Sequence, residues 1–305
     1  MTERYDNPPL GIALMLGFCI VAPLADALAK LLGPHVSIGQ LVFLRFAVQA
    51  VVLVPLTLAT GRPWRMRGRV LALTAIRTGL HVAGIALMFT GLLFLPLADA
   101  VAIAFVMPFI MLLLGHVVLG EEVGWRRLSA CAVGFAGTLL VLQPAFAEVG
   151  WPALLPLGVA LVFALFMLVT RQIAGITDPV GMQAVSALMA LPVCGAAIVL
   201  APDNLDRALG WAAPTGPTWI LLIAMGLLGT AGHLLMTWSL RYAPASTLAP
   251  MQYLEIPVAT IFGYLIFADL PGPLASLGIG IILAAGLWIV RRERAMLRAR
   301  SKEPF

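Results

Sequence analysis

The sequence has very few charged residues. Asp, Glu, Lys and Arg make up 11% of its 305 residues, whereas 61% are hydrophobic and the mean hydropathy is +1.01. A soluble domain of this length keeps roughly a quarter of its residues charged to cover its surface, so much of this surface must face lipid. Apolar stretches of about 20 residues recur along the chain, each long enough to cross a hydrocarbon core of about 30 Å. The composition therefore predicts an all-α integral membrane protein.

Cysteine and the motifs of common catalytic sites are also scarce. Cys19, Cys131 and Cys194 are isolated within apolar stretches, and their spacing is not that of a disulfide framework or a metal site. Paired metal-binding His on one helical turn, a Gly-x-Ser-x-Gly elbow and a nucleotide-binding loop do not occur in the sequence. We therefore expect no metal, no cofactor and no catalytic residues.

Ten segments are apolar and long enough to be transmembrane helices. We expect these helices at about 10–32, 38–60, 70–94, 98–119, 128–144, 152–172, 180–201, 218–240, 245–267 and 273–291. With the N-terminus in the cytoplasm, 15 of the 19 basic residues lie inside, Arg207 lies outside, and Lys30, Arg45 and Arg77 lie within helices. This asymmetry follows the positive-inside rule and predicts a multi-pass protein of a bacterial inner membrane with both termini cytoplasmic. The net charge of +5 thus reflects topology and lipid contacts and does not indicate a nucleic-acid partner.

The two halves of the chain resemble each other at an offset of 148 residues. An ordered series in the first half is repeated in the second: Ala83, Gly84, Leu87, Met88, Leu92 and Pro96 recur as Ala231, Gly232, Leu235, Met236, Leu240 and Pro244. Each half holds five predicted helices, and an odd number inverts the second half relative to the first. Inverted repeats are typical of transporters, whose halves can open a midplane site to either side. We expect two five-helix repeats, 10–144 and 152–291, and a basic cytoplasmic tail, 292–305.

Several short motifs point to a known family. They are Leu119-Gly120-Glu121 at the end of the fourth predicted helix, Arg45-Phe46 in the second, Tyr253-Leu254-Glu255 in the ninth, and Asp269 at the end of the ninth. In these features the chain resembles the drug/metabolite transporter superfamily, in its ten-helix EamA branch, over about residues 10–291. It departs from the family pattern at Pro257, one place later than expected, and at Asp269, where a Glu is expected.

This resemblance implies a secondary transporter that moves a small organic metabolite by alternating access. Members resembling this chain export amino acids and related metabolites, or take up riboflavin or S-adenosylmethionine. An intramembrane enzyme and a non-transporting membrane scaffold remain alternatives. A carrier in liposomes moves its solute unchanged, whereas an enzyme alters the solute and a scaffold does neither. The sequence leaves the substrate, the coupling ion and a homodimer open.

The ninth predicted helix carries a carboxyl group at its centre. A charge at such a depth costs about 2.5–3.5 kcal/mol on insertion scales, so it needs a reason. Gln252 lies three residues before Glu255, on nearly the same helical face, and Tyr253 is adjacent. Glu255 could bind an amine-bearing substrate, carry a coupling proton or hold neighbouring helices together. We expect these three residues to contribute to a substrate-binding or coupling site.

The third predicted helix and its repeat partner, the eighth, supply further candidates. Arg77 and His81 are four residues apart and share a face, so together they could bind an anionic group. Alternatively, His81 is a satisfied core residue and Arg77 extends to the cytoplasmic surface. Gly84 and Gly232 are expected to leave room for substrate in one shared cavity. Trp238 is a candidate for the same site, with simple packing as the alternative.

Three charged residues in the first two helices are candidates for gating or for structural ion pairs. Asp26 and Lys30 are four residues apart in the order that favours pairing, so we expect them to form an ion pair. Arg45 lies in the neighbouring helix, from which it could also pair with Asp26.

Overall fold

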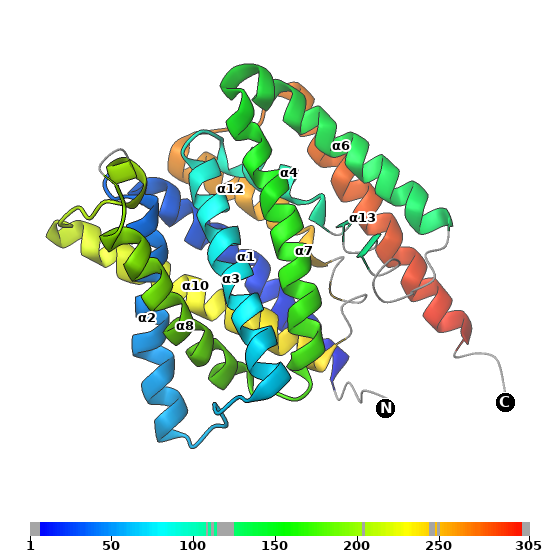
Figure 1. Ribbon diagram of the computed structural model, residues 1–305. Coiled ribbons are helices and arrows are strands. Elements are labelled where there is room, and N and C mark those ends of the chain that lie inside the picture. The colour runs from blue at the N-terminus through cyan, green and yellow to red at the C-terminus, as the bar shows by residue number, and fades with distance from the viewer. Residues whose placement is uncertain are drawn as a thin grey trace.

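In the computed structural model, residues 7–107, 109–110, 113–114, 125–202, 205–243, 248 and 251–300 are described (Figure 1). All regular elements within these ranges are helices. They are α1 (Pro8–Leu32), α2 (Ile38–Ala59), α3 (Gly68–Leu92), α4 (Leu97–Ala104), α6 (Trp125–Val149), the 3₁₀ turn η1 (Trp151–Leu154), α7 (Leu155–Ala174), α8 (Pro179–Val199), α9 (Asp206–Leu209), α10 (Gly216–Tyr242), α12 (Glu255–Phe267) and α13 (Pro273–Arg300).

Many of the described helices have the length that a membrane requires. Seven of them are long and apolar enough to cross a bilayer, and Glu255–Phe267 and Pro273–Trp288 are shorter apolar helices. Capping residues mark several starts, because the first backbone N–H groups of a helix need acceptors. Asn7 accepts from the N–H of Leu10, Ser37 from that of Gln40 and Asp178 from that of Gly181.

The two halves of the molecule run in opposite directions. In Figure 1, α1 and α3 rise toward the top of the view, whereas their repeat partners α7 and α10 descend. The contacts follow the same symmetry: α1 packs on α10 as α7 packs on α3, and α2, α4 and α6 pack on their own counterparts α8, α12 and α13. The prediction of an all-α membrane fold made of two inverted repeats is confirmed.

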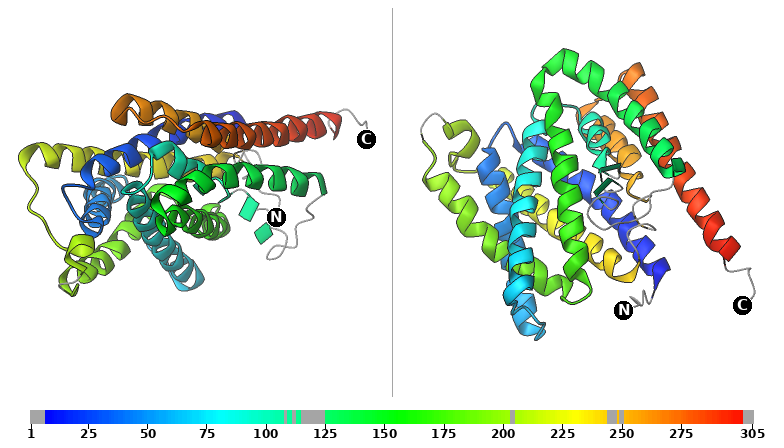
Figure 2. Two further views of the ribbon diagram at one scale, coloured as in Figure 1. Left: turned by 90° about the horizontal axis from the view of Figure 1, so that it is seen from above. Right: turned by 45° about the vertical axis from the view of Figure 1, so that its right-hand side comes forward.

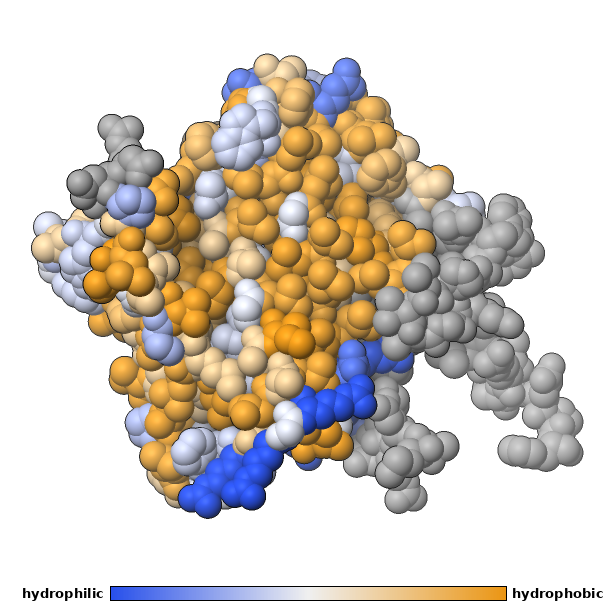
Figure 3. Space-filling view, in the orientation of Figure 1, coloured by the Kyte–Doolittle hydropathy of each residue, from blue (hydrophilic) through white to orange (hydrophobic). Residues whose placement is uncertain are grey.

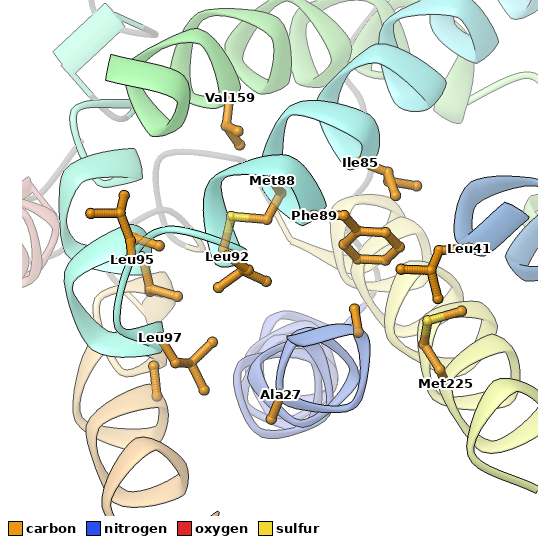
Figure 4. Packing of buried hydrophobic residues seen from close by; sticks show 14 of the residues in the cluster. Ala27, Leu41, Ile85, Met88, Phe89, Leu92, Leu95, Leu97, Val159 and Met225 are labelled. Carbon is orange, nitrogen blue, oxygen red and sulfur yellow. The ribbon is translucent and has the colours of Figure 1, made fainter. Parts of the chain in front are cut away.

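Helix α1 lies at the centre of this arrangement. Ala27 and Ala29 are buried in it, and small side chains allow neighbouring helices to approach closely. Figure 4 shows Ile85, Met88 and Phe89 of α3, with Leu41 from α2 and Met225 from α10, around α1. The main hydrophobic core therefore joins the first half to the second and is not divided between them.

The outermost pair of helices packs backbone against backbone. Helices α6 and α13 lie side by side in both views of Figure 2. A Cβ atom on Gly137 would lie 2.9 Å from the carbonyl oxygen of Gly278, so a larger residue at this crossing would push the helices apart. Helix α13 continues to Arg300, past the predicted end at residue 291 and into the predicted tail. The Arg, Glu, Ala, Met and Leu residues of this extension are good helix formers.

Two of the predicted transmembrane helices are interrupted, which corrects the prediction of continuous helices over 98–119 and 245–267. Helix α4 ends at Ala104 and is followed by a turn at Phe105–Val106, and a turn at Tyr253–Leu254 precedes α12. These turns are one repeat length, 148 residues, apart. Pro257 explains the second turn, because proline lacks an N–H and its ring clashes with the carbonyl four residues earlier, here that of Tyr253. That carbonyl accepts from Ile256 instead, at 3.3 Å.

The interruption moves the ninth-helix acid. Glu255 is the first residue of α12 and not a mid-helix residue as predicted. Pro108 stands 149 residues before Pro257, one residue more than the repeat length. Pro108 itself lies outside the described residues. The rings of Phe105 and Tyr253 lie against each other, with centroids 5.4 Å apart, so the two interruptions meet inside the molecule.

Charged residues gather at the two ends of the helices. Figure 3 shows an apolar face between hydrophilic upper and lower edges. At one end, Arg62 bonds to Asp178 at 2.9 Å and thereby joins the α2–α3 loop to the start of α8. At the other end, Lys30 and Asp269 join α1 to the residues after α12. The first end carries the basic loops that the positive-inside rule assigns to the cytoplasm.

The membrane orientation leads to a labelling prediction. In a variant without its three native cysteines, a Cys in place of the exposed Ala213 should react with an impermeant thiol reagent added to intact cells. A Cys in place of Trp64, which is 39% exposed in the α2–α3 loop, should react only after the membrane is opened. Gel-shift labelling with a maleimide measures both, and the reverse pattern would invert the assigned topology.

Candidate substrate cavity

A cavity lies where the two halves meet. It holds about 950 Å³ of empty space, open solvent at its mouth included. Its walls come from α1, α2, α3 and α4 of the first half and from α7, α10 and α12 of the second. The cavity therefore has the location that alternating access requires, between two inverted units.

Many of the large side chains in the cavity wall are aromatic or contain sulfur. Four phenylalanines line it, Phe18, Phe89, Phe105 and Phe163, together with four methionines, Met88, Met107, Met225 and Met236. Met88 and Met236 are equivalent in the two repeats, and both are buried. Phenylalanine faces and methionine thioethers make favourable contacts with flat aromatic rings.

The polar groups of the cavity come from five residues, Asp26, Arg45, His233, Gln252 and Glu255. The carboxyl groups of Asp26 and Glu255 form no hydrogen bond or salt bridge with another described residue. Asp26 nevertheless lies close enough to both Arg45 and Glu255 for electrostatic interaction. Two acidic groups thus share the cavity with one guanidinium. Such groups are expensive to keep in a membrane and commonly mark the path of a substrate or a proton.

Arg45 is held in place by the backbone of α10. It is 4% exposed, its Nη2 donates to the carbonyl of Gly229 at 3.2 Å, and its guanidinium carbon lies 5.4 Å from the ring centroid of Phe46. A Cβ atom on Gly229 would lie 2.8 Å from the Arg45 Nε, so only glycine leaves space for this side chain. Nη1 has no partner among the described residues.

The predicted pairing of Asp26 with Lys30 is wrong. Lys30 extends its amine toward the end of the molecule, where Nζ contacts Asp269 at 3.3 Å and donates to the carbonyl of Leu95 at 3.0 Å. Those oxygens lie nearer the surface, where a charged amine is more easily solvated. Asp26 faces the cavity instead, in the electrostatic field of Arg45 but without a direct salt bridge to it.

The comparisons with known proteins place the chain in a family. A model described as the EamA-like transporter family matches residues 9–143 and 150–291. This protein belongs to the EamA-like transporter family. One solved crystal structure superposes with a TM-score of 0.64 at 17% identity, over 95% of this chain and 99% of that one, which shows a shared fold. The resemblance stated from the sequence motifs is therefore confirmed.

Curated relatives of this EamA-like protein are transporters of small metabolites. A riboflavin transporter of Rhizobium johnstonii is 33% identical over 77% of this chain and 72% of its own length. A riboflavin transporter of Brucella anthropi is 25% identical over 93% and 99% of the two chains. An S-adenosylmethionine uptake transporter of Rickettsia prowazekii is 26% identical over 95% of each chain. This protein is accordingly a multi-pass membrane transporter of a small metabolite.

The predicted site residues of this EamA-like transporter fall into two groups. Gln252, Glu255 and Gly232 line the cavity, as do Asp26 and Arg45. The others lie behind its wall or elsewhere. Gly84 faces Phe163, and a Cβ atom on Gly84 would lie 3.1 Å from the Phe163 ring. Tyr253 packs on Phe105. Trp238 packs at the edge of a separate small cluster that contains Leu53 and Val180.

Arg77 is fully buried outside the cavity. Its Nε donates to Thr170 at 2.9 Å, its Nη1 donates to Ser186 at 3.0 Å, and its guanidinium lies 4.5 Å from the ring centroid of Phe166. These contacts join α3 to α7 and α8. The structure therefore gives Arg77 a helix-bridging environment made of neutral hydroxyl groups and an aromatic ring.

His81 forms a contact that the sequence did not predict. Its Nε2 lies 3.1 Å from the Nε2 of His233, and Phe46 and Phe166 pack around the His81 ring. Only His233 of this pair lines the cavity. The available signal was that these two histidines lie in helices that are repeat partners, α3 and α10.

The cavity wall leads to a prediction on two glycines. Gly232→Leu should lower the initial transport rate at least about tenfold, equivalent to about 1.4 kcal/mol, because the new side chain enters the cavity. Gly84→Leu should act similarly by pushing Phe163 inward. Gly280→Leu is the control, because a Cβ atom there meets nothing within 4 Å. All three should reach the membrane, as measured by detergent extraction and gel filtration. Parental rates in both of the first two variants would contradict this assignment of the cavity.

Proposed function

We propose that this protein carries riboflavin across a bacterial inner membrane by alternating access, with both termini in the cytoplasm. The observation that supports this substrate most is the aromatic and methionine lining of the cavity. The isoalloxazine ring of riboflavin is flat, uncharged and polar along one edge only. A cavity whose larger apolar side chains are mostly phenylalanine and methionine, with polar groups from five residues, is chemically matched to such a ring.

The relatives support the same substrate. The riboflavin transporter of Rhizobium johnstonii is the most similar of the three relatives described above, at 33% identity. The other riboflavin transporter matches this chain along nearly its whole length. We infer that the substrate passes unchanged, since a carrier needs only to bind it and release it on the other side.

Alternating access has a structural basis in the two halves. In this proposal, residues 10–144 and 152–291 are the units that move against each other. The cavity lies between them, and the interruptions at Phe105–Val106 and Tyr253–Leu254 border it. Transporters of inverted-repeat architecture commonly bind substrate beside such discontinuous helices.

A second substrate is favoured by one specific observation. Asp26 and Glu255 bring two carboxyl groups to a cavity with one guanidinium, that of Arg45. This excess of acid suits a cation, and S-adenosylmethionine carries a positively charged sulfonium and an ammonium group. The Rickettsia prowazekii relative is an S-adenosylmethionine uptake transporter.

Purified protein in liposomes separates these possibilities. We expect saturable uptake of radiolabelled riboflavin that excess unlabelled riboflavin abolishes and excess S-adenosylmethionine leaves unchanged. Gly232→Leu in the same liposomes is the matched control for leakage. The label recovered from the lumen should co-migrate with riboflavin on chromatography.

Each other outcome identifies a different function. Uptake of S-adenosylmethionine without riboflavin uptake would establish the second substrate and contradict the first. A chemically altered product would indicate an enzyme, and retention of neither compound above the Gly232→Leu control would contradict transport of both.

A further inference from the structure

We infer that Gln252 determines specificity by forming two hydrogen bonds with a ring edge that carries an N–H beside a carbonyl group. In riboflavin this is the imide edge of the pyrimidine ring. The inference rests on the proposed function, because it names the part of the flavin that the cavity recognises. It assigns a role to the amide of Gln252 rather than to the charges nearby.

Gln252 is buried, yet its amide has no hydrogen-bond partner among the described residues. The residue is 3% exposed and lines the cavity. No described residue forms a hydrogen bond with its side chain. Its amide atoms are not fully buried, so the amide is open to the cavity. An amide that finds no protein partner in a largely apolar membrane cavity is at a free-energy disadvantage. A bound substrate that supplies a donor and an acceptor would recover that energy.

The other buried glutamines show what a structural role looks like in this protein. Gln49 donates to the backbone carbonyl of Gln183 at 2.8 Å, and Gln40 donates to that of Ala212, also at 2.8 Å. Gln183 in turn donates to the hydroxyl of Thr237 at 3.2 Å. Each of these side chains joins two helices or a helix and a loop. Gln252 forms no such connection, so its amide is available for a ligand.

The repeat shows that the polar groups at this position are specific to one half. Counting back 148 residues, Gln252 corresponds to Ala104 and Glu255 corresponds to Met107, and all four residues line the cavity. Of two related segments in the cavity wall, one therefore carries an amide and a carboxyl group and the other is apolar. A ring system that is polar along one edge fits this asymmetry, with its polar edge toward Gln252.

The chemistry of the amide selects the edge. The carbonyl oxygen of Gln252 accepts one hydrogen bond and its NH₂ group donates another, in one plane. A cyclic imide offers the complementary pair, a ring N–H and an adjacent carbonyl oxygen. Arg45 lines the same cavity, and its positive charge favours electron-rich carbonyl oxygens nearby.

The test compares riboflavin with 3-methylriboflavin, in which a methyl group replaces the imide hydrogen. Binding to the purified full-length protein is measured by quenching of flavin fluorescence. We expect 3-methylriboflavin to bind at least about tenfold more weakly than riboflavin, because sites that pair a buried polar group reject analogues that lack the matching group. In Gln252→Met the ratio of the two dissociation constants should fall to about one.

Two variants complete the test. Gln172→Met makes the same change at an exposed glutamine outside the cavity and should keep the parental ratio. Gln252→Leu removes both hydrogen-bonding groups and serves if Gln252→Met does not fold. Its ratio of the two dissociation constants should likewise fall to about one, because no donor or acceptor remains to pair with the imide edge.

The outcomes separate this inference from the proposed function. Equal binding of the two flavins by the parent, or a parental ratio in Gln252→Met, would overturn the role of Gln252 and leave riboflavin as substrate. A parental ratio in Gln252→Leu would overturn the role as well. Absence of riboflavin binding by the parent protein would instead overturn the proposed function.

Discussion

Water is absent from the core of a bilayer, so each polar group placed there must find its partner inside the protein or in a substrate. The buried polar residues of this transporter follow from that constraint. Arg77 is held by two hydroxyl groups and a ring, Gln49 is held by Gln183, and Arg45 by a backbone carbonyl. Against this background, the open groups of Asp26, Gln252 and Glu255 stand apart, and all three line one cavity. Among the described residues, some buried polar atoms outside the cavity also lack a partner, such as Nη2 of Arg77 and Oε1 of Gln49, but each of these side chains has another polar atom that is hydrogen-bonded.

The sequence predicted the architecture well because membrane helices have a strong signal. Their length and apolar composition are dictated by the bilayer, and the recurrence of Gly84 and Met88 as Gly232 and Met236 revealed the duplication. The interruption before Glu255 was harder to locate. Pro257 was visible, but whether a proline bends a helix or ends it depends on whether neighbouring groups can satisfy the freed backbone.

The candidate site was only partly predictable, because sequence spacing reports neighbours along one helix but not across helices. Asp26 and Lys30 have ideal spacing for a pair, yet Lys30 contacts Asp269, 239 residues away. Likewise, Arg77 and His81 share a face but take different partners on other helices. Gln252 was selected only for its proximity to Glu255. Whether a buried glutamine has a partner depends on other segments of the chain, as the bonds of Gln40, Gln49 and Gln183 show, so the open amide of Gln252 could not be read from sequence spacing.

The central position of α1 has a consequence for how the protein is made. Helix α1 is synthesised early, but it packs on α10, and the partner of Lys30 follows α12. During synthesis the first five helices therefore enter the membrane before Asp269 is available, and the carbonyl of Leu95 is the acceptor that the first half supplies to Lys30. The core of the first half is incomplete without the second, because α3 packs on α7 and α2 packs on α8. Maturation of this transporter thus awaits its last helices, and a ribosome that stops midway leaves a fragment suited to recognition by membrane quality control.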